Sequence, residues 1–112
     1  MEIEIPEWAK ELDYAITVCD REGVVLYMND KAIATFADSG DMIGKSMFGC
    51  HNENSMKIIH RLLDEGGKNV YTIDKKGQKK LIYQTGWKKD GKIMGLVEIS
   101  LVLPAEIPHY IR

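Results

Sequence analysis

The last third of the sequence constrains the fold most, because it alternates apolar and polar residues and is broken only by glycine-containing turns. Extended segments are expected at 69–74, 80–87 and 93–103. Lys75-Lys76-Gly77 separates the first two segments, and an Asp90-Gly91 turn signal separates the last two. Turns this short join antiparallel neighbours, whereas parallel strands need a long crossover. This part of the chain therefore predicts an antiparallel meander.

A second hairpin is expected near the N-terminus. Residues 15–19 and 24–28 are rich in β-branched side chains, and a turn ending in Gly23 lies between them. Asn29 and Asp30 follow the second strand, where a short polar side chain can cap a helix over 31–36. The predicted order up to this point is strand, turn, strand, helix.

The longest expected helix covers 54–65, because its apolar residues recur at helical spacing while charged residues occupy the other side. Gly66-Gly67 ends it, as glycine commonly does at a helix C-terminus. A glycine-bearing bend beginning at Ile43 precedes this helix, and His60 lies on the helix itself. If the protein holds a small molecule, we expect this bend and helix to form the wall that it touches.

These elements predict an α+β fold with one five-stranded antiparallel sheet and helices packed on one face. A chain of 112 residues with 45% hydrophobic content suits a single core. The expected domain covers 14–103, between an N-terminal helical cap over 1–13 and a C-terminal tail over 104–112. In the cap, a short helix is expected over 6–12, with Trp8 and Leu12 four residues apart on one face, and it must pack on the domain or on a second copy of the chain.

Composition argues against several classes of protein. A formal net charge of −2 disfavours a nucleic-acid surface. Lys75, Lys76, Lys79 and Lys80 cluster, but at a hairpin tip, where solvated lysines are common. No apolar run is long enough for a membrane span, and the acidic N-terminus does not resemble a secretory signal. The two cysteines lack close metal-ligand spacing, so we expect reduced thiols in a cytoplasmic protein.

Three local motifs then accompany this order of elements. They are Ala15-Ile16-Thr17-Val18-Cys19-Asp20 followed by Gly23 and Asn29, the Ile43-Gly44-Lys45 bend, and Asp90-Gly91 ahead of Gly95 and Glu98-Ile99-Ser100. With these motifs the chain resembles the PAS domain over roughly residues 12–103. The resemblance implies a sensory or signalling module that binds a small ligand or cofactor between the sheet and the helical middle, or that dimerises. A homodimer and a signalling partner protein are the expected macromolecular contacts.

The resemblance also allows the cofactor classes to be compared residue by residue. In flavin-binding members the bend carries a reactive cysteine, but here Met47 occupies that place and Cys50 is displaced by three residues, so a flavin adduct is disfavoured. Haem-binding members carry the iron ligand early in the long helix, where this chain has Ser55 and Met56. His51, just before the helix, keeps haem open as an alternative and is the one candidate metal ligand, but the favoured interpretation is that it caps or packs against the helix start.

Two functional hypotheses follow. In the first, a small-molecule ligand or cofactor occupies a pocket lined mainly by apolar residues. The candidate lining residues are Phe36, Met47, Phe48, Cys50, His51, Met56, Ile59, Leu63, Tyr83 and Trp87. In the second, the same residues are ordinary core and the domain only dimerises.

Catalysis finds little support in the sequence. We expect no enzyme, because the chain shows no phosphate-binding loop and no nucleophile–base spacing. Cys50 and His51 are adjacent, and the side chains of neighbours generally diverge. Glu98 would be buried if its strand faced it inward, and an Arg or Lys partner would then be the usual explanation.

Overall fold

The computed structural model describes residues 3–36, 42–48 and 52–112. Its sheet contains β1 (Ala15–Asp20), β2 (Val25–Met28), β3 (Lys68–Lys75), β4 (Gln78–Lys89) and β5 (Lys92–Val102). All pairings are antiparallel, and the strand order is β2-β1-β5-β4-β3. The predicted α+β fold and its five-stranded antiparallel sheet are therefore confirmed, with the meander and the first hairpin joined through β1 and β5.

The two turns of the meander have the backbone conformation that their sequence favours. Lys76 and Gly77 have φ values of 52° and 77°, and Asp90 and Gly91 have values of 52° and 79°. Two consecutive residues with positive φ form the turn that matches the twist of a two-residue hairpin. These turns join β3 to β4 and β4 to β5 as direct neighbours, and a register shift between Trp87 and Lys88 interrupts the second pairing close to its turn.

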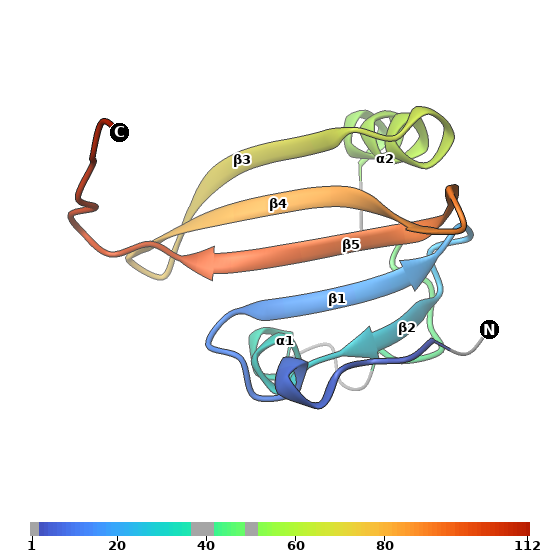
Figure 1. Cartoon of the computed structure of the whole chain (residues 1–112), viewed down its shortest axis with the longest axis horizontal. Coiled ribbons are helices and arrows are strands. Elements are labelled where there is room, and N and C mark those ends of the chain that lie inside the picture. The colour runs from blue at the N-terminus through green and yellow to red at the C-terminus, as the bar shows by residue number, and fades with distance from the viewer. Residues whose placement is uncertain (1–2, 37–41, 49–51) are drawn as a thin grey trace.

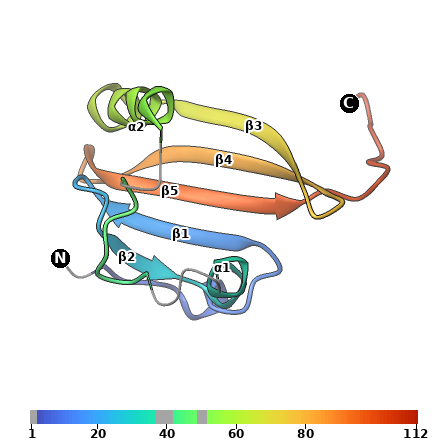
Figure 2. The ribbon, with the colours of Figure 1, turned by 180° about the vertical axis from the view of Figure 1, so that it is seen from behind.

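Helices α1 (Asp30–Thr35) and α2 (Glu53–Glu65) lie on one face of the sheet, which we call the inner face. Figures 1 and 2 show α1 beside β1 and β2, while α2 lies at one end of the meander, and the C-terminal tail leaves at the other end. The buried residues form two clusters, one beneath each helix. Part of the inner face, between the two helices, is left without a helix above it (Figure 2). No helix in the described ranges is both long and apolar enough to cross a membrane.

The N-terminal segment differs from its prediction. It forms only a short 3₁₀ helix, η1 (Glu7–Ala9), rather than a helix from residue 6 to 12. The carbonyl of Ala9 accepts a hydrogen bond from the Asn29 side chain, and the carbonyl of Lys10 accepts one from the Asp30 backbone. These carbonyls are therefore used by another segment, where a continuing helix would have needed them for its own backbone.

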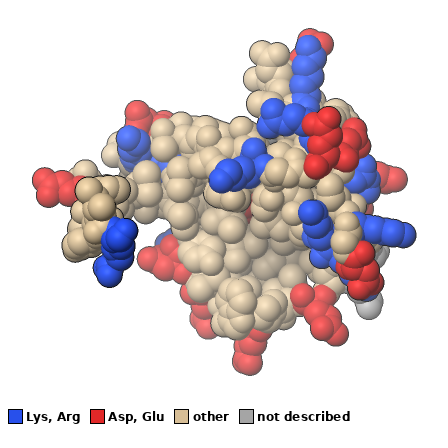
Figure 3. Space-filling model, turned by 45° about the horizontal axis from the view of Figure 1, so that its top comes forward, with Lys and Arg blue, Asp and Glu red and all other residues tan. Residues whose placement is uncertain are grey.

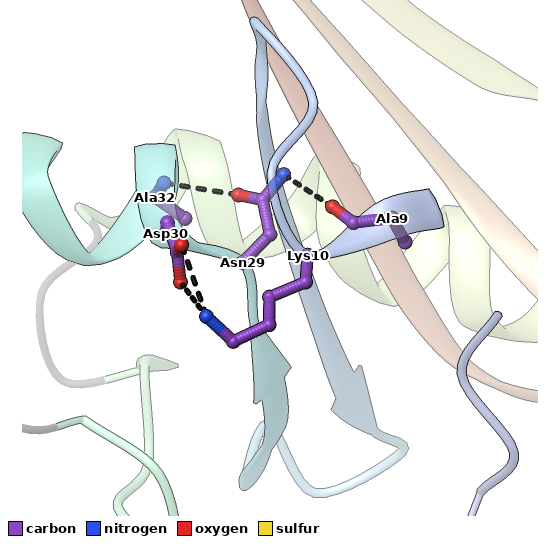
Figure 4. Close-up of polar contacts among 5 residues, drawn as sticks. All are labelled: Ala9, Lys10, Asn29, Asp30 and Ala32. Carbon is purple, nitrogen blue, oxygen red and sulfur yellow. Dashed lines mark hydrogen bonds and ion pairs between the residues drawn. The ribbon is translucent and has the colours of Figure 1, made fainter. Parts of the chain in front are cut away.

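Asn29 holds this end of the molecule together. It is fully buried, and its Oδ1 accepts from the backbone N–H groups of Ile16 and Ala32, both at 3.0 Å. Its Nδ2 donates to the carbonyls of Ala9 and Tyr14. Figure 4 shows Asn29 between α1 and the N-terminal segment, beside the Lys10–Asp30 ion pair. The predicted helix cap is confirmed, and the same side chain also fixes the N-terminal segment and β1.

Candidate functional site

The segment from Met42 to Phe48 forms one wall of the space above the inner face. Backbone hydrogen bonds hold it to the first hairpin: the N–H of Gly44 donates to the Val25 carbonyl, and that of Met47 donates to the Gly23 carbonyl. The Phe48 ring lies directly over Gly23, where a Cβ atom would overlap it. Gly23 has a φ of 83° and no side chain, so it both makes the turn and leaves room for the ring.

Helix α2 forms the opposite wall. Ile59, Leu62 and Leu63 are buried against Cys19 of β1 and Leu96 of β5. Arg21 secures the end of α2, because its guanidinium donates to the Leu63 carbonyl at 2.6 Å and pairs with Asp64 at 3.0 Å. The helix is thereby fixed over one end of the sheet.

A small cavity lies between α2 and the sheet. Its volume is about 20 Å³, room for about one water molecule. The lining residues are Thr17, Cys19, Met47, Phe48, Ile59, Gln84, Leu96 and Glu98. A ligand larger than water would therefore not fit beneath α2 as the helix lies here.

A larger hollow continues along the part of the inner face that α2 does not cover. We call it the inner-face groove; its volume is about 230 Å³. It is lined by Thr35, Phe36, Met47, Tyr71, Ile73, Lys75, Lys80, Ile82, Glu98 and Ser100. Met47 and Glu98 line both spaces, so the groove begins where the small cavity ends. Mostly apolar walls with a few polar groups are the usual composition of a small-molecule site.

A row of polar side chains crosses the sheet at that junction. Asn69, Gln84 and Glu98 are neighbours on β3, β4 and β5. Nδ2 of Asn69 donates to Oε1 of Gln84, and Nε2 of Gln84 donates to Oε1 of Glu98, each at 3.0 Å. Gln84 is buried, so its amide is held in one orientation and in turn holds the Glu98 carboxylate. The sequence led us to expect an Arg or Lys partner for Glu98, and that expectation is wrong.

The negative charge of Glu98 acts on its neighbours. Burial, with a further contribution from Glu98, raises the pKa of the Tyr71 hydroxyl in the groove. Burial also raises the pKa of the Cys19 thiol to about 11, and the charges of Asp20 and Glu98 add to that shift. Cys19 is a free cysteine and therefore stays a neutral, unreactive thiol near neutral pH.

The structure brings together six of the sequence-predicted lining residues on the helix side of the sheet. Met47, Phe48 and Ile59 line the small cavity, and Phe36 and Met47 line the groove. Met56 and Leu63 pack in the core cluster under α2 and line neither space. Cys50 and His51 lie outside the described residues.

Tyr83 and Trp87 do not belong to this site, so their prediction as lining residues is wrong. They alternate along β4 with the inward-facing Gln84 and lie on the outer face of the sheet. Trp87 borders an open hollow of about 750 Å³ on that face, together with Val18, Met94 and Val97. The prediction exchanged the two faces of β4. Leu81, Tyr83 and Trp87 are larger and more apolar as a set than Ile82, Gln84 and Gly86, and were therefore expected to be buried.

The sequence reasoning did not identify several residues of the site as ligand contacts, among them Tyr71, Ile82, Ser100 and Gln84. The alternation pattern contains the signal that could have found them. Glu98 and Ser100 lie two apart on one strand, and whichever face holds one must hold the other. Placing the polar set inward would have predicted the groove.

The described residues do not fit a metal or a haem. No three of their His, Cys, Asp or Glu side chains are grouped so that they could hold an ion. Cofactor sites generally have volumes of about 300–1,000 Å³. The spaces of 20 and 230 Å³ on the inner face are smaller than that range.

Solved structures share this architecture. The Aer2 receptor of Vibrio cholerae, described as a dual PAS-heme oxygen sensor, is 12% identical, with a TM-score of 0.60, over 81% of this chain and 95% of its own. The PAS domain of a LuxR-family transcriptional regulator from Burkholderia thailandensis, in complex with ethanol, is 14% identical, with a TM-score of 0.54, over 88% and 98% of the two chains. The chain thus has the fold of a PAS domain, and the predicted resemblance is confirmed.

A third similar structure belongs to a longer chain, of which only part is matched. The VqmA dimer of Vibrio cholerae is 17% identical, with a TM-score of 0.65, over 93% of this chain. The chain spans only 54% of the VqmA chain. No family model matches the sequence, and no curated protein matches it significantly.

Proposed function

We propose that this domain is a sensory module that binds a small organic ligand in the inner-face groove. The observation that carries the proposal is the uncovered stretch of inner face, where apolar walls surround the half-buried Glu98 carboxylate. If the domain needed only a packed core, side chains larger than Ser100 and Thr35 would fill this space and make the fold more stable. The proposed role is binding rather than catalysis, and the proposed location is the cytoplasm.

Similar structures support this proposal without deciding it. One neighbour is described as holding ethanol and another as a haem sensor, so this fold can hold small molecules of different kinds. The groove of 230 Å³ suits a ligand below drug size. A haem held by His51 is not proposed, because the two inner-face spaces are smaller than cofactor sites generally are.

Native mass spectrometry of the purified protein tests the proposal. Ser100→Phe places a ring in the groove, whereas the control Thr72→Phe places the same ring on the exposed outer side of β3. We expect the wild type and Thr72→Phe to carry an additional small mass and Ser100→Phe to lack it. Bare protein in all three samples, or the same bound mass in all three, would contradict the proposal.

A second candidate function is dimerisation, and a specific observation favours it. Trp8 in the N-terminal segment is 66% exposed, and Val70, on the outer face of the sheet, is 42% exposed. Large apolar side chains left exposed can mark a contact with another chain. We propose a homodimer to which the N-terminal segment contributes, and this role is compatible with ligand binding in the groove.

Charge does not favour nucleic acid as a partner. On the face that Figure 3 shows, Lys and Arg side chains are interspersed with Asp and Glu around the edge and do not merge into one basic area. Nucleic-acid surfaces need a concentration of positive charge. A protein or a second copy of this chain is therefore the proposed macromolecular partner.

A further inference from the structure

The position of charges along the inner-face groove indicates what kind of ligand it would take. Glu98 lies at the inner end, next to the small cavity, and Lys75 and Lys80 lie at the outer end. Lys80 is paired with Val102, which lies four residues beyond Glu98 on β5. The backbone positions of Glu98 and Lys80 are therefore about 13 Å apart along the strand direction. The groove is thus acidic at one end and basic at the other.

The Glu98 carboxylate has one oxygen in use and one available. Oε1 accepts the hydrogen bond from Gln84. Within residues 3–36, 42–48 and 52–112, Oε2 has no hydrogen-bond donor, and the ion pairs are Lys10–Asp30, Arg21–Asp64 and Lys31–Asp13. The Glu98 side chain is only partly buried, so Oε2 is accessible to a ligand, and a charged N–H donor binds a carboxylate more strongly than a neutral donor does.

Between the two ends the groove is mainly apolar. Phe36, Met47, Ile73 and Ile82 supply its walls, and the hydroxyls of Thr35, Tyr71 and Ser100 are the uncharged polar groups. A flat or slender apolar body would lie against these walls. The side chain of Lys80 is long and flexible, so its ammonium group can approach such a body and shorten the separation between the charged groups.

We propose that the groove takes a small, elongated zwitterion. Its protonated nitrogen pairs with Oε2 of Glu98, its apolar body lies between Met47 and Ile82, and its acidic group faces Lys80. This inference rests on the proposed function, since it specifies the chemistry of the ligand in the same groove.

Four matched probes separate the contributions of charge. They are 4-(aminomethyl)benzoic acid, which is zwitterionic, 4-methylbenzylamine, 4-methylbenzoic acid and 4-methylbenzyl alcohol. Binding to the full chain is measured by calorimetry, and the site is located by shifts in the amide NMR signals of Tyr71, Ile82 and Ser100. We expect the zwitterion to bind most tightly, followed by the amine.

Two variants and a control test the residues. Glu98→Gln is isosteric and still offers an oxygen to Gln84, so it should preserve the fold while weakening the zwitterion and the amine about tenfold or more. Lys80→Met should weaken the zwitterion and leave the amine unchanged. Glu106→Gln, in the exposed tail, should change neither.

The failures are distinguishable. The zwitterion proposal would be overturned if Glu98→Gln and the wild type bound the probes equally well, or if 4-methylbenzoic acid bound more tightly than the amine. Either result would leave the proposal of a ligand-binding groove in place. The zwitterion proposal is also contradicted if no probe shifts the amide NMR signals of the groove residues, while the purified wild type carries a bound mass that Ser100→Phe lacks. Absence of both the probe shifts and the bound mass would overturn the proposed function as well.

Discussion

Trp87 reaches across β5 to β1, where its indole Nε1–H donates a hydrogen bond of 2.9 Å to the Cys19 carbonyl oxygen. The residue it crosses is Gly95, the cross-strand partner of Trp87. A Cβ atom at Gly95 would overlap both the Cys19 carbonyl oxygen and the indole nitrogen. This contact joins the three central strands on the outer face, behind the cavity that Cys19 lines on the inner face.

The first prediction follows from that contact. Gly95→Ala should destabilise the fold by about 2–3 kcal/mol, because the methyl group forces Trp87 and β1 apart. Denaturant unfolding followed by tryptophan fluorescence measures the loss. Gly77→Ala serves as a comparison, since a Cβ there meets no atom and only the positive φ opposes it. A cost at Gly95 no larger than that at Gly77 would contradict the close approach.

The second prediction concerns Asn29. Asn29→Ala removes four hydrogen bonds from a buried site and should cost about 3 kcal/mol of unfolding free energy. Asn52→Ala is the matched variant, because Asn52 caps α2 through a single exposed hydrogen bond to Ser55 and should cost about 1 kcal/mol. Thermal unfolding of both variants checks the difference, and equal losses would show that Asn29 acts only as a cap.

The fold was largely predictable from local signals. Asn29 and Gly66 mark helix ends, and the Lys76-Gly77 and Asp90-Gly91 turns fix the meander, because each depends on a few consecutive residues. The N-terminal helix was not predictable, because its carbonyl groups are taken by Asn29 and Asp30 from a distant part of the chain.

The site was harder to predict than the fold. Which face of β4 points inward depends on what covers each face, and both faces of that strand carry apolar side chains. Tyr83 and Trp87 therefore drew the prediction to the outer face, while Gln84, which holds Glu98, was passed over. Only the paired register of β4 and β5 shows that Gln84 and Glu98 are neighbours.

The third prediction is a pH dependence. The pKa of Cys19 is about 11 in the fold, above its ordinary value of 9.0, because burial disfavours the thiolate. Its contribution to stability is therefore fully present below pH 9 and is lost as the pH rises toward 11. In a Cys50→Ser background, alkylation by iodoacetamide at pH 8 should be slow when folded and fast in denaturant. Rapid alkylation of the folded protein would contradict the buried, neutral thiol.

The fourth prediction concerns association. Light scattering at micromolar concentration should give the mass of a dimer, and Trp8→Ala should weaken that dimer because the side chain is 66% exposed in the single chain. Glu4→Ala, in the same segment, provides a control for the loss of a polar side chain. A monomer mass for the wild type, or a dimer that Trp8→Ala leaves unchanged, would count against this interface.

The inner-face groove as a ligand site is tested most directly by one difference spectrum. Amide NMR signals are compared between the protein as purified and the same protein after unfolding, removal of small molecules and refolding. We expect the changes to gather at Tyr71, Ile82 and Ser100, the residues that line the groove, and to spare Val18 and Met94 on the outer face. Identical spectra, or changes confined to Val18 and Met94, would contradict ligand binding in the groove.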